Sequence, residues 1–318
     1  MKAKKRNFFL QYIKNLFLAF VRKIVGINRF KRKKYFKRKI LSPEESNDFI
    51  YKSLLLNKKT FIARLGDVEC RLLLNQEQVN HHMKKRVPNK TRKVAFTNAG
   101  MFETTDEGIK TFHDIFCKHM KNVTGFCVWF NQMEDYLIDT YSAESILLSL
   151  DGLESYLYKQ PWTSALKGKK VLVISPFAET IKQQYMQNRE KLFINNPDTL
   201  PEFFLTTYKS FYTLPGEKNS FKHWSDVLLK MKSDCMQLDF DVAIIGCGSY
   251  GLALAGMLFD EGKSVIHAGG VTQVFFGVRG KRWDQRPYME KYINDSWVRP
   301  SFNERPSSAS NIEGGCYW

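Results

Sequence analysis

The sequence predicts an α/β fold with a largely parallel β-sheet and helices on both faces. Strand-like apolar runs alternate with helix-like segments along most of the 318 residues, which is typical of strands joined by crossover helices. In one stretch, "DVAIIGCGSYGLALAG", a strand pattern runs through a glycine-rich turn directly into a helix pattern. A hydrophobic content of 43% and an aromatic content of 14% exclude a mainly disordered chain.

The folded domain is expected to span residues 42–318. Its first helix begins with a capping box of Ser42 and Glu45 around Pro43. The predicted strands cover residues 60–65, 125–130, 169–177, 241–246 and 264–270. The further predicted helices cover residues 105–122, 178–193, 221–234 and 250–262. Because right-handed crossovers place the loops after parallel strands along one edge of the sheet, we expect the ligand site at that edge.

Residues 1–41 are predicted to form a separate basic arm. Residues 1–39 hold fifteen Lys and Arg residues and no acid, so without these charges the formal net charge falls from +17 to a nearly neutral +2. On a helix, five polar positions fall within an arc of about 100° (Asn7, Gln11, Lys14, Asn15 and Arg22). The charges argue against a simple membrane span. The pattern favours a helix that lies on an anionic membrane surface, with a solvated tail or an RNA-binding arm as alternatives.

Six cysteines are scattered along the chain without a C-x-x-C pair. This spacing predicts reduced thiols in a cytosolic protein. Neither disulfides nor a zinc site is expected from it, since a zinc site would have to be assembled from distant positions.

Two carboxylates follow the first predicted strand, in "FIARLGDVECRLLLN". Asp67 and Glu69 can direct hard oxygen ligands at one divalent cation, and Gly66 permits a tight turn before them. Arg64 could clamp phosphates in the same place. The structural alternative is that Asp67 caps the helix that follows and Glu69 lies in its first turn.

A second candidate site is the glycine-rich turn of Gly246, Gly248 and Gly251, together with Ser249 and Tyr250. A strand before it and a helix after it are the context of a phosphate-binding turn. A dinucleotide site is less expected, because the next strand ends at His267, where an acid would bind the ribose.

Two further loops attract attention. Ser175 lies at a strand-to-helix junction that could offer backbone N–H groups to an anion, although Ser-Pro also simply starts helices. The segment after His267 is rich in Gly and polar groups, among them Lys281, Arg282 and Asp284. Glu103 belongs to a weaker candidate loop, "TNAGMFETTDEG".

The stretches "ARLGDVE" and "DVAIIGCGSYGLALAGMLFDEGKSVIHAGG" resemble the glycosyltransferases of the GT-D fold. "PFAETI", "HAGGVTQVFFGVRGKRW" and "EGGCYW" are similar to proteins encoded in bacterial capsule and surface-polysaccharide clusters. The likeness covers most of residues 50–318. It implies a Rossmann-like domain, a divalent metal (Mn²⁺ or Mg²⁺) at Asp67 and Glu69, a nucleotide contact at Arg64, and a nucleotide or sugar pocket lined by the glycine turn. The family usually has Gly between the two acids, where this chain has Val68.

We therefore expect a metal-dependent glycosyltransferase that moves a sugar from a nucleotide-diphosphate sugar to a lipid-linked surface-glycan precursor. Lys281 or Arg282 would help to stabilise the leaving diphosphate, and His267, Glu103 or Asp284 would activate the acceptor hydroxyl. The expected location is the cytoplasmic face of the plasma membrane, reached through residues 1–39, with no nucleic-acid partner. The alternatives are an NAD(P)-dependent oxidoreductase that uses the glycine turn and a non-catalytic membrane- or RNA-binding module.

Overall fold

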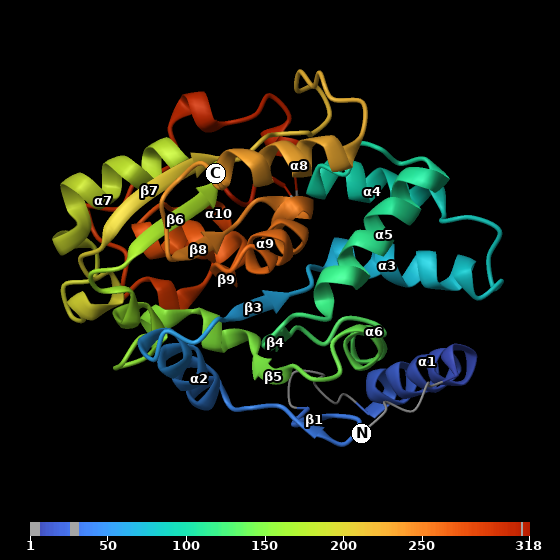
Figure 1. Ribbon diagram of the computed structural model, residues 1–318. Helices are drawn as coiled ribbons and strands as arrows, with labels where there is room; N and C mark the ends of the chain where they lie inside the picture. Colours follow the sequence, from blue (N-terminus) through green and yellow to red (C-terminus); the bar gives the residue numbers. More distant parts are fainter. Residues whose placement is uncertain (1–6, 26–31, 313) are drawn as a thin grey trace.

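The computed structural model describes residues 7–25, 32–312 and 314–318 (Figure 1). Its centre is a seven-stranded sheet with the order β5-β4-β3-β9-β8-β6-β7. Every neighbouring pair is parallel. The strands are β3 (Phe61–Arg64), β4 (Gly125–Val128), β5 (Ile146–Ser149), β6 (Lys170–Ser175), β7 (Phe204–Lys209), β8 (Val242–Ile245) and β9 (Ser264–His267). The predicted α/β class with a parallel sheet is confirmed.

Helices connect these strands. They are α2 (Pro43–Leu55), α3 (Asp67–Asn80), α4 (Asn89–Ala99), α5 (Asp106–Met120), α6 (Glu134–Tyr141), α7 (Ala178–Leu192), α8 (Trp224–Cys235), α9 (Gly251–Asp260) and the short α10 (Lys281–Asp284). The capping box at the start of α2 forms as predicted, because Ser42 accepts from the Glu45 N–H and Glu45 accepts from the Ser42 N–H.

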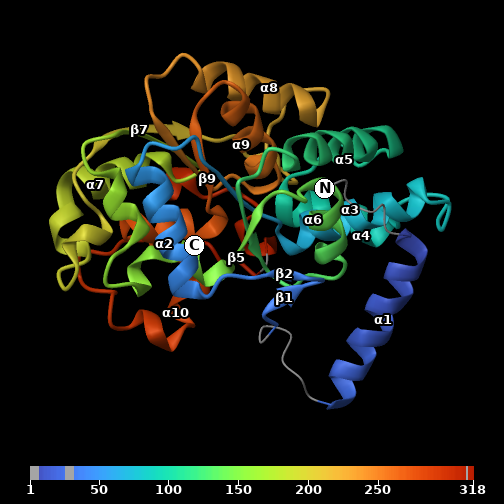
Figure 2. The ribbon, with the colours of Figure 1, turned by 60° about the horizontal axis from the view of Figure 1, so that its bottom comes forward.

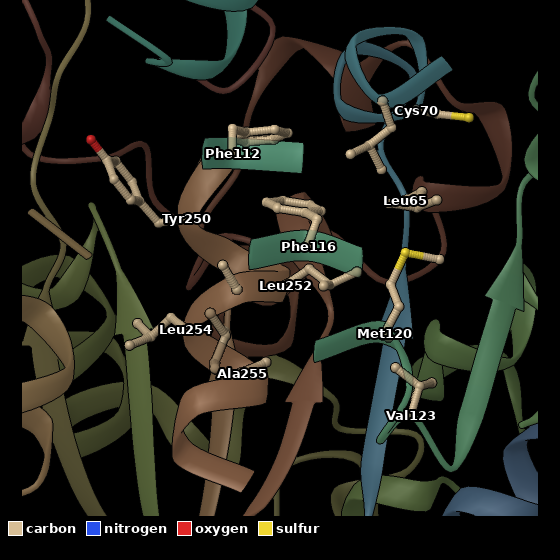
Figure 3. Packing of buried hydrophobic residues seen from close by; sticks show 14 of the residues in the cluster. Leu65, Cys70, Phe112, Phe116, Met120, Val123, Tyr250, Leu252, Leu254 and Ala255 are labelled. Carbon is tan, nitrogen blue, oxygen red and sulfur yellow. The ribbon is translucent and has the colours of Figure 1, made fainter. Parts of the chain in front are cut away.

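The sheet is covered on both faces. Alternate residues of β6 point to two separate hydrophobic clusters, Leu172 and Ile174 to one and Val171 and Val173 to the other. The first cluster includes buried residues of α3, α5, α8 and α9. Figure 3 shows its packing, with Phe112 and Phe116 of α5 beside α9. The second cluster includes α2 and α7. Burial on both faces explains why these strands are apolar at successive positions.

Strands β5 and β7 of the central sheet, and helices α4 and α6, lie outside the predicted elements. Both strands are at the edges of the sheet, and the residues of β7 are only half-buried or exposed. Its sequence, "FLTTYK", therefore lacks the apolar run that marks the central strands. Helices α4 and α6 begin without an N-cap side-chain hydrogen bond, and α6 has only eight residues.

The connections leave strands β6 and β8 in opposite directions. From β6 the chain passes through α7 to β7, at the edge of the sheet, whereas from β8 it passes through α9 to β9, towards β3. Strands β6 and β8 are neighbours, so the carboxyl ends of this pair form a topological switch point. Open α/β sheets bind ligands in the crevice at such a point.

The N-terminal helix α1 (Phe8–Val25) touches the domain through its first half, where Phe8 and Asn15 are buried and Tyr12 packs against the core. Phe8 is buried and stacks on His81 at 4.6 Å between ring centroids, and Figure 2 shows the rest of the helix extending away from the domain. The hairpin of β1 (Lys34–Tyr35) and β2 (Arg38–Lys39) joins the domain through Tyr35, which donates a hydrogen bond to Glu134 at 2.7 Å. Residues 1–6 and 26–31 of the predicted arm lie outside the described residues. Among the described helices, none is long and apolar enough to cross a membrane.

Candidate functional site

A cavity of about 330 Å³ opens at the carboxyl edge of the sheet. It is lined by segments that follow six of the strands, β3, β4, β6, β7, β8 and β9, and by the end of α4 and the C-terminal residues Tyr317 and Trp318. The predicted location of the site, after the parallel strands, agrees with this geometry.

Asp67 and Glu69 both line this cavity, in the first turn of α3. Asp67 forms an ion pair with Arg71 at 2.5 Å, and both side chains are about half exposed. Glu69 folds back over Gly66, because a Cβ atom on Gly66 would lie 1.9 Å from the Glu69 Oε2 atom. The two carboxylates therefore stabilise the start of the helix and face the cavity at the same time.

Arg64, the last residue of β3, has a guanidinium group that contacts an aromatic ring and a glycine. Its Cζ atom lies 5.1 Å from the centre of the Trp129 ring. The guanidinium also lies against Gly269, where a Cβ atom would be 1.9 Å from the Arg64 Nη2 atom. Arg64 and Gly269 both line the cavity. The aromatic ring and the glycine thus position the arginine. A larger residue in place of Gly269 would displace the Arg64 side chain.

The glycine turn after β8 packs tightly against two other segments, the end of β9 with the residues after it and the end of α4. A Cβ atom on Gly246 would lie 2.4 Å from the Gly269 carbonyl oxygen. On Gly248 it would lie 3.0 Å from the Ala99 carbonyl oxygen, and on Gly251 it would lie 2.3 Å from the His267 Nε2 atom. Gly246 and Gly248 line the cavity, whereas Gly251 does not. Close packing is therefore sufficient to require glycine at Gly246 and Gly251.

The two other predicted residues of this turn, Ser249 and Tyr250, differ in orientation. Tyr250 lines the cavity, stacks on Trp224 with 5.2 Å between ring centroids, and shares a hydrogen bond of 2.8 Å with Thr213. Ser249 is buried outside the lining, where its hydroxyl accepts from the Trp224 indole N–H at 3.0 Å. Tyr250 can contact a ligand, while Ser249 orients a core tryptophan.

Ser175 lines the cavity at the end of β6, but the backbone N–H groups near it already have partners. Its hydroxyl accepts from the Phe177 N–H at 3.1 Å. The buried Glu304 carboxylate accepts from the N–H groups of Glu179 and Thr180, in the first turn of α7. The anion that these amides would attract is therefore supplied by the chain itself, from 124 residues away.

The three residues predicted as bases all lie outside the cavity lining. His267 is buried beneath Gly251, and burial together with the Arg64 charge holds its pKa well below the usual value. Glu103 accepts hydrogen bonds from His223 Nδ1 and the Trp224 N–H, at the start of α8. Asp284 pairs with Arg279 and Arg299. Glu103 and Asp284 thus have structural partners, whereas the buried His267 Nδ1 atom has no hydrogen-bond partner among the described residues. The catalytic roles of all three residues stay predictions.

Arg282 and Lys281 contact the C-terminal residues Tyr317 and Trp318, respectively. Arg282 lines the cavity, and its Nη1 donates to the Tyr317 hydroxyl at 3.0 Å. Lys281 is exposed and lies outside the lining, and only its backbone N–H contacts the C-terminal Trp318. Tyr317 and Trp318 themselves form part of the cavity wall.

Sequence reasoning missed the segment Ser210–Leu214, which follows β7 and forms one side of the cavity. Its signal was weak because strand β7 itself was not predicted. Asn98 and Gly100 line the cavity from the end of α4. Gly100 is the left-handed C-cap of α4, so the "NAG" motif marks a helix end.

No family model matches this chain, and no curated protein matches it. A solved structure described as the selenomethionine-substituted domain of unknown function 1792 aligns with 76% of this chain and 81% of its own. The identity is 14% and the TM-score is 0.35. A likeness this distant assigns neither family nor function.

Proposed function

We propose that this protein is a metal-dependent glycosyltransferase that uses a nucleotide-diphosphate sugar. The observation that carries the proposal is that two carboxylates, Asp67 and Glu69, and two guanidinium groups, Arg64 and Arg282, line one cavity at the carboxyl edge of the sheet. A volume of about 330 Å³ lies within the usual range for ligand pockets. Carboxylates beside arginines suit a ligand that brings both a cation and phosphate groups.

Asp67 and Glu69 would hold the Mn²⁺ or Mg²⁺ ion, because both metals prefer hard oxygen ligands. When bound, such an ion neutralises charge on a departing diphosphate. The Asp67–Arg71 ion pair is largely exposed, so it opposes this role only weakly. Arg64 would donate two parallel N–H groups to a phosphate. Its contact with Trp129 and Gly269 orients it before the ligand arrives.

The oxidoreductase alternative receives less support from the same site. In a dinucleotide-binding turn the second glycine lets the backbone approach a pyrophosphate. Here the Ala99 carbonyl oxygen lies 3.0 Å from a Cβ position on Gly248. The residue at the end of β9 is the buried His267 and not an acid that would bind a ribose.

The proposed acceptor is a lipid-linked glycan precursor, reached through α1 at an anionic membrane surface. Large apolar side chains of α1 are exposed, including Phe17 at 64% and Phe20 at 63%. Helices with such a face, flanked by basic residues, bind membrane interfaces. Sedimentation of the full chain with vesicles of mixed anionic and neutral lipids tests this, with Phe17→Ser/Phe20→Ser expected to weaken binding. Binding that is equal on neutral vesicles, or replaced by binding to single-stranded RNA, would contradict it.

The donor site is tested by calorimetry of the full chain with a panel of nucleotide sugars, with and without Mn²⁺. We expect metal-dependent binding of one donor, lost in Asp67→Ala/Glu69→Ala. The matched control is Asp106→Ala/Glu107→Ala, which removes two acids from the first turn of α5, including one paired with an arginine, but leaves the cavity unchanged. Equal loss in both double variants would mean that the acids act only on helix stability.

A further inference from the structure

A buried cluster of three different ligand types lies between α3 and α5, outside the cavity lining. Glu77 belongs to α3, and His113 and Cys117 are spaced i, i+4 on α5. This spacing puts His113 and Cys117 on one face of their helix. Their exposed fractions are 2% for Glu77, 4% for His113 and 6% for Cys117. The function proposed above uses none of these residues.

The ligand atoms of this cluster all lie within 4.8 Å of one another. The Cys117 Sγ atom is 3.5 Å from His113 Nε2, and Glu77 Oε1 is 2.6 Å from the same nitrogen. In a tetrahedral zinc site with bonds of about 2.0–2.3 Å, neighbouring ligand atoms are roughly 3.3–3.7 Å apart. The sulfur–nitrogen distance already meets this requirement, and the carboxylate must move by about 0.7 Å.

We propose that Glu77, His113 and Cys117 form a zinc-class metal site. A thiolate and an imidazole nitrogen favour Zn²⁺ over Mg²⁺ or Mn²⁺, which prefer oxygen ligands. The site is therefore distinct in both place and chemistry from the carboxylates Asp67 and Glu69, and it does not depend on the proposed function.

His81 offers a further ligand atom beside the cluster. It lies four residues after Glu77, at the C-cap of α3, with its Nε2 atom 3.4 Å from Glu77 Oε2. Its ring is also the surface on which Phe8 of α1 stacks, nearly parallel at 6°. Metal held by His81 would thus tie together α3, α5 and the contact that anchors the N-terminal helix.

The charges of the cluster suit a divalent metal despite its burial. Glu77 and a Cys117 thiolate would supply two negative charges to one Zn²⁺ ion, so the loaded cluster would bury no net charge. The proton of the Cys117 thiol would leave when the metal binds, because the thiolate is the ligand.

Cobalt substitution of the full chain tests this site, since Co²⁺ bound to a thiolate gives a charge-transfer absorption band in the near ultraviolet. We expect the band, at one Co²⁺ per chain, in the wild type, in Asp67→Ala/Glu69→Ala and in the control Cys235→Ser, which alters a buried cysteine outside the cluster. We expect its loss in Cys117→Ser. Circular dichroism establishes that each variant is folded. If Cys117→Ser unfolds, Glu77→Gln replaces it, and we expect that variant to weaken Co²⁺ binding at least tenfold.

Absence of the band in the folded wild type, or its persistence in Cys117→Ser, would overturn the proposal. Calorimetry of Zn²⁺ binding at pH 7, in buffers of different ionisation enthalpy, gives a second measurement. Release of at least one proton per Zn²⁺, from the Cys117 thiol, supports the proposal. Release of none contradicts it.

Discussion

Replacing Gly269 by alanine should displace Arg64 from the cavity wall. The backbone at Gly269 has a φ of +65°, which costs a non-glycine residue about 1–2 kcal/mol. The new Cβ atom would also lie 1.9 Å from Arg64 Nη2 and 2.5 Å from Arg64 Cζ. The guanidinium must therefore leave the Trp129 ring, and the loss of this cation–π contact costs about 0.5–1 kcal/mol of stability in addition.

The matched control for this substitution is Gly168→Ala. Gly168 has a similar φ of +71°, but nothing lies within 4 Å of its Cβ position. It therefore carries the backbone strain without the clash. In urea unfolding, Gly168→Ala should lose about 1–2 kcal/mol, and Gly269→Ala should lose more than this.

Donor binding separates the two variants further. If Arg64 holds a phosphate, its displacement removes a charge-assisted hydrogen bond of about 1.5–3 kcal/mol. Affinity for the nucleotide sugar in calorimetry should then fall roughly 10- to 150-fold in Gly269→Ala, and stay unchanged in Gly168→Ala. Wild-type affinity in Gly269→Ala would refute the assignment of Arg64 to the ligand.

Three other predictions concern stability. Because the folded-state pKa of His113 is raised to about 10, the stabilising effect of the protonated ring is present below pH 6.5 and is lost as pH rises towards 10. Urea unfolding of the metal-free chain should show this loss of stability, and His113→Gln should make the stability less dependent on pH. Glu304→Gln should destabilise the chain by about 1–3 kcal/mol in the same assay, since the first turn of α7 loses its charged acceptor; a change no larger than that of the exposed Glu290→Gln would contradict this. Phe8→Ala should release α1, seen as faster proteolysis within residues 8–25 with little change in the melting temperature of the domain; unchanged proteolysis would mean that other contacts hold the helix.

Local signals in the sequence were sufficient for most of the fold. The capping box at Ser42, the apolar runs of the central strands and the glycine turn after β8 each depend on neighbouring residues, and each forms as predicted. Strand β7 was missed because an edge strand buries little apolar surface and so leaves little hydrophobic pattern.

The candidate site was predictable in place but not in detail. The position of Asp67 and Glu69 after a parallel strand was enough to put them at the ligand edge of the sheet. The burial of His267 beneath Gly251 and the pairing of Asp284 with Arg299 depend on contacts between distant segments. Such contacts leave no local pattern.

The sequence by itself determined the α/β class, the carboxyl edge of the sheet as the place of the candidate site, and the basic, amphipathic character of the N-terminal arm. These properties follow from the periodicity and charge of short segments. Only the tertiary structure decided which polar groups face the cavity and which are already satisfied: Glu304 reaches the first turn of α7 from far along the chain, and Glu77, His113 and Cys117 meet between two helices. The physical reason is that buried polar groups must find partners, and those partners are chosen by the packing of the whole chain.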